Sequence, residues 1–137
     1  MRDHDTFRKY LEKKFLNKKA HKYGAKPKDG FPSTLERETF DELLLRERAG
    51  EIRDLSRYAS VDLGFGIKWK VDFKFVYVAT GQPGWCEAKG KWTADAGNKL
   101  KMWRNGAGPG PLEIYMSKNG TPTLVEVVVP KPMKETK

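Results

Sequence analysis

Apolar and polar residues alternate with a period of two along residues 67–78. The apolar positions are Ile67, Trp69, Val71, Phe73, Phe75 and Tyr77, and the polar positions between them are Lys68, Lys70, Asp72 and Lys74. This pattern is typical of a β-strand with one apolar face and one ionic face. The turn-forming residues 81–84 (Gly-Gln-Pro-Gly) follow, so residues 85–89 are predicted to be the return strand of a hairpin.

Two segments before this strand have helical spacing. A helix is predicted to begin at Ser33 or Thr34, because a hydroxyl side chain caps a helix, and to end at Gly50. An earlier amphipathic helix is predicted from apolar residues with i, i+3, i+4, i+8 spacing, namely Phe7, Tyr10, Leu11 and Phe15. The glycine, proline and lysine residues of segment 23–32 indicate a linker or flexible loop between the two helices.

The remaining predicted elements are short. Residues 58–63 resemble a strand, and residues 96–103 a helix that ends in the glycine-proline cluster 106–111. Residues 112–116 and 123–129 are predicted to be strands joined around Asn119-Gly120, a strong hairpin signal. The predicted order ααβββαββ indicates an α+β fold.

Charge points to a polyanionic partner. The 137 residues contain 27 Lys and Arg against 18 Asp and Glu, a formal charge of +9. Residues 1–30 hold ten of the basic and four of the acidic residues, so this segment carries +6 of that charge. Nucleic acid is the first candidate partner. We predict a basic N-terminal helical arm and linker at 1–30, a single core domain at 31–130 and a basic tail at 131–137.

Several classes of protein are excluded by composition. Cys86 is the single cysteine, so an intrachain disulfide is impossible, and no Cys/His cluster has zinc-ligand spacing. His4 and His21 lie in the basic arm without neighbouring ligands and are interpreted as solvated. No apolar run approaches the roughly 18 residues of a membrane span. We therefore expect a soluble, intracellular, cytoplasmic protein with no membrane partner.

Three ionisable residues form the candidate catalytic site. Asp72 is the lone acid on the ionic face of the long strand, and Glu87-Ala88-Lys89 places an acid and a base on one face of the next strand. Two carboxylates can hold a divalent cation, and a nearby ammonium group can orient an attacking water. Glu36, in the first turn of the second helix, would add an acid if that helix packs at the sheet edge.

At these residues the sequence resembles the PD-(D/E)XK nuclease superfamily, whose signature is an acid on one strand and Glu-x-Lys on the next. More narrowly, the segments 33–36, 71–73 and 86–92 are similar to small phage endonucleases of the Holliday-junction resolvase (endonuclease I) type. The superfamily's proline is absent, since Val71 precedes Asp72. The resemblance implies a restriction-endonuclease-like core, with a central mixed β-sheet flanked by helices.

The resemblance also implies an activity. Such nucleases depend on Mg²⁺ or Mn²⁺ and hydrolyse DNA. Carried over, Asp72 and Glu87 would be metal ligands, Lys89 would position the nucleophile, and Glu36 would assist as a further ligand. Resolvases of this kind act as dimers, so a homodimer, acting in a phage-infected bacterium, is a further expectation.

Five further residues are candidates for contact with nucleic acid. Trp92, beside basic residues, is suited to contact with an unpaired base. The others are suited to salt-sensitive phosphate contacts: Lys91, Lys99, Lys101 and Arg104.

Simpler interpretations stay open. Asp72 could form an ordinary cross-strand ion pair with a lysine. Ser33-x-x-Glu36 is also a capping box, in which case Glu38 would be the substitute ligand. Pairing Asp72 directly opposite Glu87 would centre the hairpin between residues 79 and 80, before the predicted turn, so we expect a bulge or a diagonal approach.

Two other functions also fit the composition. The first is a non-catalytic basic nucleic-acid-binding protein that uses lysines and aromatic residues on a sheet. The second is a nuclease fold that serves as a subunit or inhibitor in a larger assembly.

Overall fold

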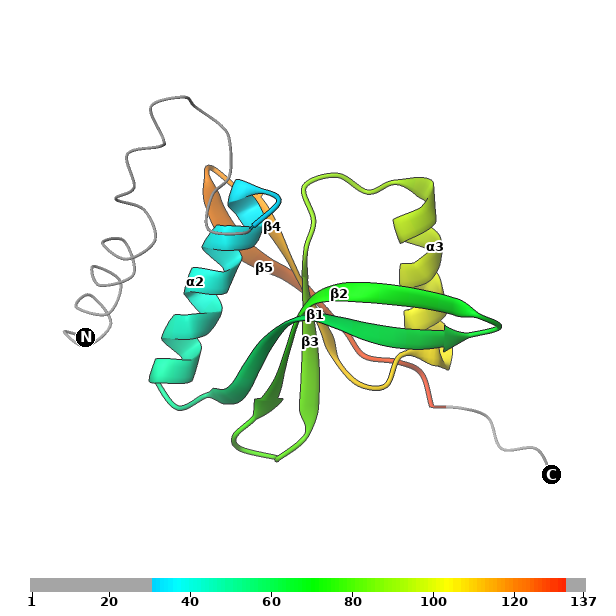
Figure 1. Ribbon diagram of the computed structural model, residues 1–137, viewed down its shortest axis with the longest axis horizontal. Helices are drawn as coiled ribbons and strands as arrows, with labels where there is room; N and C mark the ends of the chain where they lie inside the picture. The colour runs from blue at the N-terminus through cyan, green and yellow to red at the C-terminus, as the bar shows by residue number, and fades with distance from the viewer. Residues whose placement is uncertain (1–30, 133–137) are drawn as a thin grey trace.

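The computed structural model describes residues 31–132, which form an α+β domain (Figure 1). In chain order the elements are α2 (Thr34–Arg48), β1 (Ile52–Gly64), β2 (Ile67–Tyr77), β3 (Pro83–Ala88), α3 (Ala94–Met102), the π-helical turn η3 (Trp103–Ala107), β4 (Leu112–Lys118) and β5 (Thr121–Val128). The predicted α+β class is confirmed. The predicted helical arm at 1–30, with His4 and His21, lies outside the described residues. No helix among the described residues is long and apolar enough to span a membrane.

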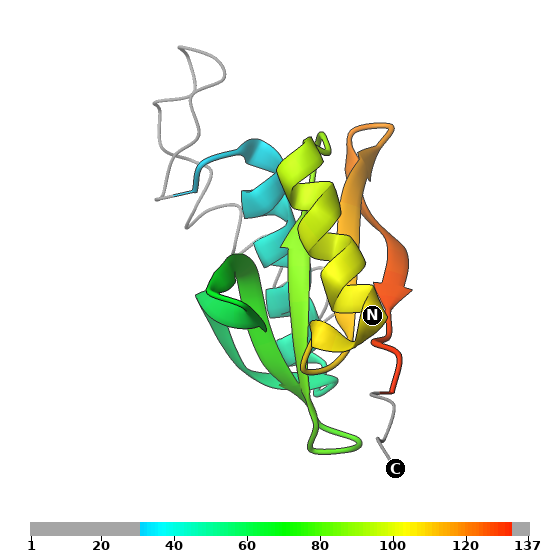
Figure 2. The same ribbon diagram turned by 90° about the vertical axis from the view of Figure 1, so that its right-hand side faces the viewer.

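The five strands form one mixed sheet in the order β1-β2-β3-β4-β5. Neighbouring strands are antiparallel except β3 and β4, which are parallel. The connection between these two passes through α3 and η3, because parallel neighbours need a crossover. Helices α2 and α3 lie on opposite sides of the sheet (Figures 1 and 2).

Two hydrophobic clusters hold the layers together. Leu43 of α2 packs in one cluster with Phe31, Ile52, Phe73, Phe75, Cys86 and Tyr115. Trp103 of η3 packs in the other with Val61, Leu63, Trp69, Val71, Trp85, Leu112, Ile114 and Val128. Cys86 is fully buried in the first of these clusters, where it packs as a small apolar side chain.

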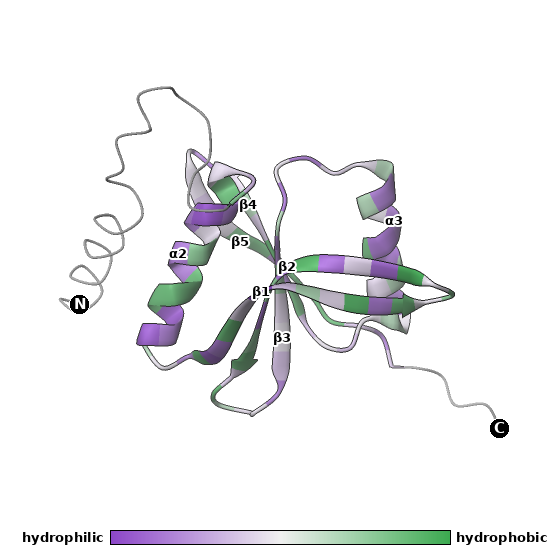
Figure 3. Ribbon diagram, viewed as in Figure 1, coloured by the Kyte–Doolittle hydropathy of each residue, from purple (hydrophilic) through white to green (hydrophobic). Residues whose placement is uncertain are grey.

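The predictions for α2 and β2 are confirmed. Ser33 caps α2, since its Oγ accepts the Glu36 N–H at 3.0 Å. Gly50 follows the helix with a φ of +85°, a conformation that favours glycine at a helix end. Along β2 the apolar residues alternate with polar ones, and the colouring of Figure 3 follows this pattern.

Strand β1 is longer than predicted, since it begins at Ile52 rather than at residue 58. The pairing with β2 shifts between Arg53 and Ser56, and Asp54 has a φ of +56°. Such a bulge interrupts the alternation of side chains, so the period of two is lost in the first half of the strand. Helix α3 similarly begins two residues earlier than predicted, capped by Thr93.

The expected bulge or diagonal approach between β2 and β3 is wrong. Phe73 pairs with Cys86 and Val76 pairs with Pro83 in one unbroken register, which places Asp72 opposite Glu87. The Tyr77 N–H donates to Gln82 O at 2.8 Å and closes the hairpin, so the turn is residues 78–81. Pro83 and Gly84 belong to the strand and not to the turn.

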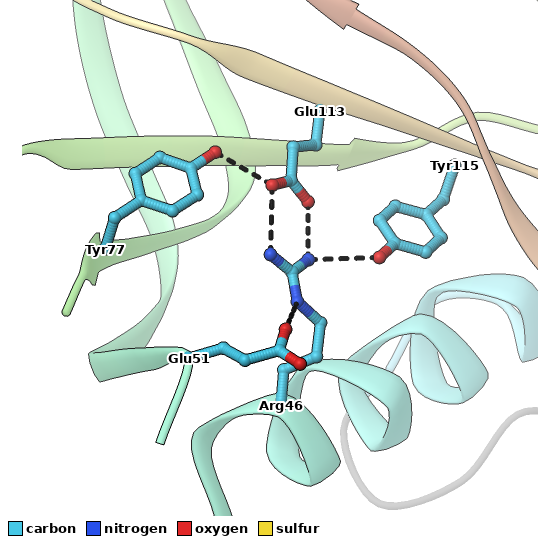
Figure 4. Close-up of polar contacts among 5 residues, drawn as sticks. All are labelled: Arg46, Glu51, Tyr77, Glu113 and Tyr115. Carbon is cyan, nitrogen blue, oxygen red and sulfur yellow. Dashed lines mark hydrogen bonds and ion pairs between the residues drawn. The ribbon is translucent and has the colours of Figure 1, made fainter. Parts of the chain in front are cut away.

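A partly buried ion pair ties α2 to strand β4 of the sheet (Figure 4). Arg46 Nη1 and Nη2 donate to the two carboxylate oxygens of Glu113 on β4, at 2.6 and 3.2 Å. The Tyr77 hydroxyl donates to Glu113 Oε2 at 2.8 Å, and Arg46 also donates to Tyr115 Oη and Glu51 Oε1 at 3.1 Å each. Both Glu113 oxygens are therefore satisfied although the residue is only 3% exposed.

Candidate active site

Asp72 and Glu87 hold each other in place across the β2–β3 pair. The Asp72 N–H donates to Glu87 Oε1 at 3.1 Å, and the Ala88 N–H donates to Asp72 Oδ2 at 2.8 Å. Each carboxylate therefore uses a backbone N–H of the opposite strand. This reciprocal arrangement fixes two acidic side chains side by side on one face of the sheet.

Lys89 and Glu36 complete the cluster. Lys89 Nζ lies 3.2 Å from Glu87 Oε2, so the amine of the Glu-x-Lys segment is turned toward the acids. Glu36, at the start of α2, is close enough to Asp72 for the two charges to interact, and it is only 5% exposed. The structure thus brings together all four predicted catalytic residues, from α2, β2, β3 and the residue that follows β3.

The acids carry strongly raised pKa values. Burial, followed by the charge of Asp72, raises the pKa of Glu87 to about 7, against the opposing effect of Lys89. Burial and the charge of Asp72 also raise the pKa of Glu36 to about 7, although Arg57 and Lys89 oppose the shift. Burial raises the pKa of Asp72 as well. The nearby cations therefore do not fully neutralise these three buried carboxyl groups. A bound divalent cation would supply the missing positive charge.

Glu36 faces the acid cluster. Its backbone N–H bonds to Ser33, as in a capping box, but its carboxylate interacts with Tyr58, Arg57 and Asp72. Its Oε2 atom is buried and makes no hydrogen bond within the described part of the chain. Glu38 lies two positions further along α2, roughly 200° around the helix axis, and so points away from Asp72.

Sequence reasoning missed Arg57 and Tyr58. Arg57 pairs with Phe73, which puts Tyr58 opposite Asp72, and Tyr58 has a φ of +61°. Arg57 Nη2 donates to Tyr58 Oη at 2.6 Å and lies 4.0 Å from Glu36 Oε2. A bulky residue in the left-handed region is costly and is often found at functional sites. The dipeptide carries no motif, so only the pairing of β1 with β2 reveals its place.

Two of the predicted nucleic-acid contacts lie beside the acid cluster. Lys91 is exposed just after β3. Trp92 is half-buried against the core cluster that contains Trp103, and its ring centroid is 5.8 Å from Lys89 Nζ. The Trp92 ring therefore has a packing role in addition to the predicted contact with a base.

The other three predicted contacts lie on α3 and η3. Lys101 is exposed, while Lys99 Nζ is 3.3 Å from Asp95 Oδ2. Arg104 Nη1 donates to Glu126 Oε2 at 2.6 Å. Both ion pairs are on the surface, where such contacts contribute little and exchange readily with a phosphate.

The donor set suits a hard divalent cation. Mg²⁺ and Mn²⁺ prefer carboxylate oxygens, and Mg²⁺ commonly binds through one or two carboxylates together with water and phosphate oxygens. Asp72 and Glu87 would supply these carboxylates, with the unsatisfied Oε2 of Glu36 beside them. No three acidic, His or Cys side chains among residues 31–132 form a metal cage by themselves. Two protein ligands completed by water and substrate are the arrangement these residues fit.

Divalent cations are expected to stabilise the protein more at pH 8 than at pH 6. The raised pKa values of Glu36 and Glu87 mean that the folded state holds extra protons between about pH 4.5 and 7, so the cation-free protein loses stability as pH rises through this range. Cations bind the deprotonated form and offset that loss. At a concentration of about 100 times its Kd, a cation stabilises the folded state by roughly 2.7 kcal/mol, which raises Tm by on the order of 10 °C.

Thermal unfolding with Mn²⁺ or with a chelator, at both pH values, measures this effect. Glu87→Gln should lose most of the Mn²⁺-dependent shift. Asp54→Asn should keep it, because Asp54 is an exposed acid paired with Arg53 at 2.7 Å. A shift of equal size in wild type and Glu87→Gln would show that the cation binds elsewhere.

Comparisons of this chain with protein-family models, curated proteins and solved structures find no match.

Proposed function

We propose that the chain is a metal-dependent endonuclease that hydrolyses DNA phosphodiester bonds, with a restriction-endonuclease-like core of the PD-(D/E)XK type. The observation that carries the proposal is the meeting of Asp72, Glu87 and Lys89 at one point of the β2–β3 pair. A protein that only binds nucleic acid has no use for buried acids beside phosphate, since they repel it. Branched DNA, including four-way junctions, is the proposed substrate class.

The site's own residues divide the work of hydrolysis. Asp72 and Glu87 would hold the cation, which when bound supplies positive charge that stabilises the developing negative charge on the phosphate. Lys89, whose Nζ is 3.2 Å from Glu87 Oε2, would hold the attacking water and offset charge in the transition state. The attacking water gives up a proton as its oxygen bonds to phosphorus, the bond to the leaving oxygen breaks, and that oxygen takes a proton, so one water is consumed for each bond cut. No covalent enzyme intermediate is needed.

Glu36 would transfer protons during hydrolysis. Its carboxyl group has a pKa of about 7, so it can accept a proton from a water or return one near neutral pH. Arg57 and Tyr58 hold this carboxyl group in position. A positioned acid with a pKa near the working pH is suited to general acid–base catalysis.

Incubating the protein with supercoiled, single-stranded and four-way-junction DNA, in Mg²⁺ or in chelator, tests the proposal. We expect cleavage in Mg²⁺, none in chelator, and the junction to be the preferred substrate. Binding to DNA without cleavage in Mg²⁺ or Mn²⁺ would contradict the nuclease and favour a non-catalytic binding protein, for which the net charge of +9 and the exposed Lys68, Lys70 and Lys74 are sufficient.

A further inference from the structure

The β1–β2 hairpin carries a fully exposed aromatic residue at its tip. Phe65 is 99% exposed and lies between Gly64 and Gly66 in the turn. Gly64 pairs with Ile67, so Phe65 and Gly66 are the two central residues of the connection, with φ values of +55° and +77°. Positive φ at both positions is typical of a type I′ hairpin turn.

The choice of residue at this turn works against stability. The first position of such a turn favours Asn, Asp or Gly, because a bulky side chain is strained at positive φ. Phe65 bears that strain and also leaves its ring in water. No contact within residues 31–132 compensates either cost, so the exposed ring points to a contact with a partner.

The rest of the hairpin is built as a rigid support. Asp62 Oδ1 accepts the Gly64 N–H at 2.8 Å and fixes the approach to the turn. Trp69 packs edge-on against Trp103 with ring centroids 6.0 Å apart, and Val61 and Leu63 are buried in the same cluster. The first half of β2 has no β3 partner, so the hairpin extends beyond the rest of the sheet (Figure 1).

A basic strip connects the tip to the acid cluster. Lys68 and Lys70 are exposed and alternate along β2 with the apolar residues, in phase with Asp72. Lys70 Nζ lies 5.9 Å from the ring centroid of Tyr58, which stands opposite Asp72. A phosphate backbone that runs from the acids along these lysines would therefore arrive at Phe65.

We propose that Phe65 is a binding site for an unpaired nucleobase, and that the hairpin thereby directs the nuclease to DNA with an unstacked base. This inference rests on the proposed function for the identity of the partner and for the cleavage that the hairpin directs. Exposed aromatic rings stack on any base, whereas in paired DNA the bases are already stacked on one another. The ring would thus favour bulged or branched DNA without reading sequence.

The length of the hairpin limits where the DNA is cut. Phe65 and Asp72 are seven positions apart along the chain, which spans at most about 23 Å in a strand. This distance corresponds to about seven base pairs of B-DNA. Cleavage is therefore expected within about seven nucleotides of the unpaired base.

Binding measured in chelator tests the inference separately from cleavage. The probes are a 30-base-pair duplex with one bulged 2-aminopurine and the same duplex fully paired. Phe65→Gly should weaken binding to the bulged duplex about tenfold or more, change binding to the paired duplex by less than about twofold, and abolish the quenching of 2-aminopurine. Glycine relieves the strain at positive φ, so the variant should fold normally.

Phe65→Trp should retain the preference for the bulged over the paired duplex. Val78→Ala truncates an exposed apolar side chain in the β2–β3 turn and should leave this preference unchanged. Equal affinity of wild type and Phe65→Gly for the bulged duplex would overturn the inference. The inference would also be overturned if Phe65→Gly kept the preference for the bulged duplex but lost self-association. That result would show that the tip of the hairpin contacts a second copy of the chain. If wild type fails to cut DNA in Mg²⁺ but the preference for the bulged duplex depends on Phe65, the nuclease proposal fails while Phe65 keeps its assignment as a base-binding site.

Discussion

Asp72→Asn is expected to reduce Mg²⁺-dependent cleavage by at least about 1,000-fold while DNA binding survives. The amide keeps the shape of the side chain, so Oδ can still accept the Ala88 N–H. What it removes is the charge that would hold the cation. A bound cation is worth several kcal/mol to the transition state, and each 1.36 kcal/mol corresponds to a factor of ten in rate.

Plasmid nicking in Mg²⁺ measures cleavage, and gel shift in chelator measures binding. Asp54→Asn is the matched control, because it removes one exposed acid far along β1 and because Asn tolerates the φ of +56° found there. Its rate should remain within about twofold of wild type. Undiminished cutting by Asp72→Asn would remove the basis of the nuclease proposal.

Arg46→Met is expected to destabilise the fold by about 3–5 kcal/mol, the largest stability effect we predict. The substitution leaves Glu113 buried with a negative charge and no guanidinium partner. Burial and the hydrogen bond to Glu113 raise the pKa of Tyr77, and burial raises the pKa of Tyr115 to about 12. Both phenols therefore stay neutral and offer Glu113 hydrogen bonds but no positive charge. Urea unfolding measures the loss as a lower midpoint.

Arg53→Met is the control for this prediction. The Arg53–Asp54 pair also has a short contact, 2.7 Å, but both side chains are more than half exposed, so the change should stay within about 0.5 kcal/mol. The double variant Arg46→Met/Glu113→Leu should recover much of the lost stability, because it removes the buried carboxylate together with its partner. Equal losses in Arg46→Met and Arg53→Met would contradict the account of the buried pair.

The elements that could be predicted from sequence are those in which the local pattern and the tertiary environment agree. Helix α2 has a hydroxyl cap at Ser33 and a stop at Gly50, and β2 alternates cleanly because one of its faces is buried. The first half of β1 offers no such pattern. It exists because β2 supplies the hydrogen-bond partners, and the shift after Arg53 hides its period.

Gly84 shows how a reasonable prediction can fail. The sequence predicts that it marks the turn together with Pro83, but it lies in β3 against two aromatic rings. A Cβ at this position would come within 2.5 Å of a Tyr77 ring carbon and 2.8 Å of a Phe75 ring carbon. The glycine is needed for packing and not for a turn, and a single sequence does not separate these two requirements.

The acid cluster could be predicted from the sequence because its acids and amine follow one another on two strands that are adjacent in the chain. Asp72, Glu87 and Lys89 stand on predicted strands, and their convergence needed only a hairpin. Arg57 and Tyr58 could not be found in the same way. Their place beside the acids follows from the pairing of β1 with β2, which depends on tertiary structure rather than on a motif.

The two neighbours of β3 differ in how much chain must be ordered before they can pair with it. The β2–β3 hairpin closes a short loop, whereas β3 and β4 meet only after the whole crossover has been ordered, which costs more chain entropy. The contact of Arg46 with Glu113 spans 67 positions and depends on β4 being docked. We therefore expect this contact to form late in folding, so that its removal accelerates unfolding more than it slows folding.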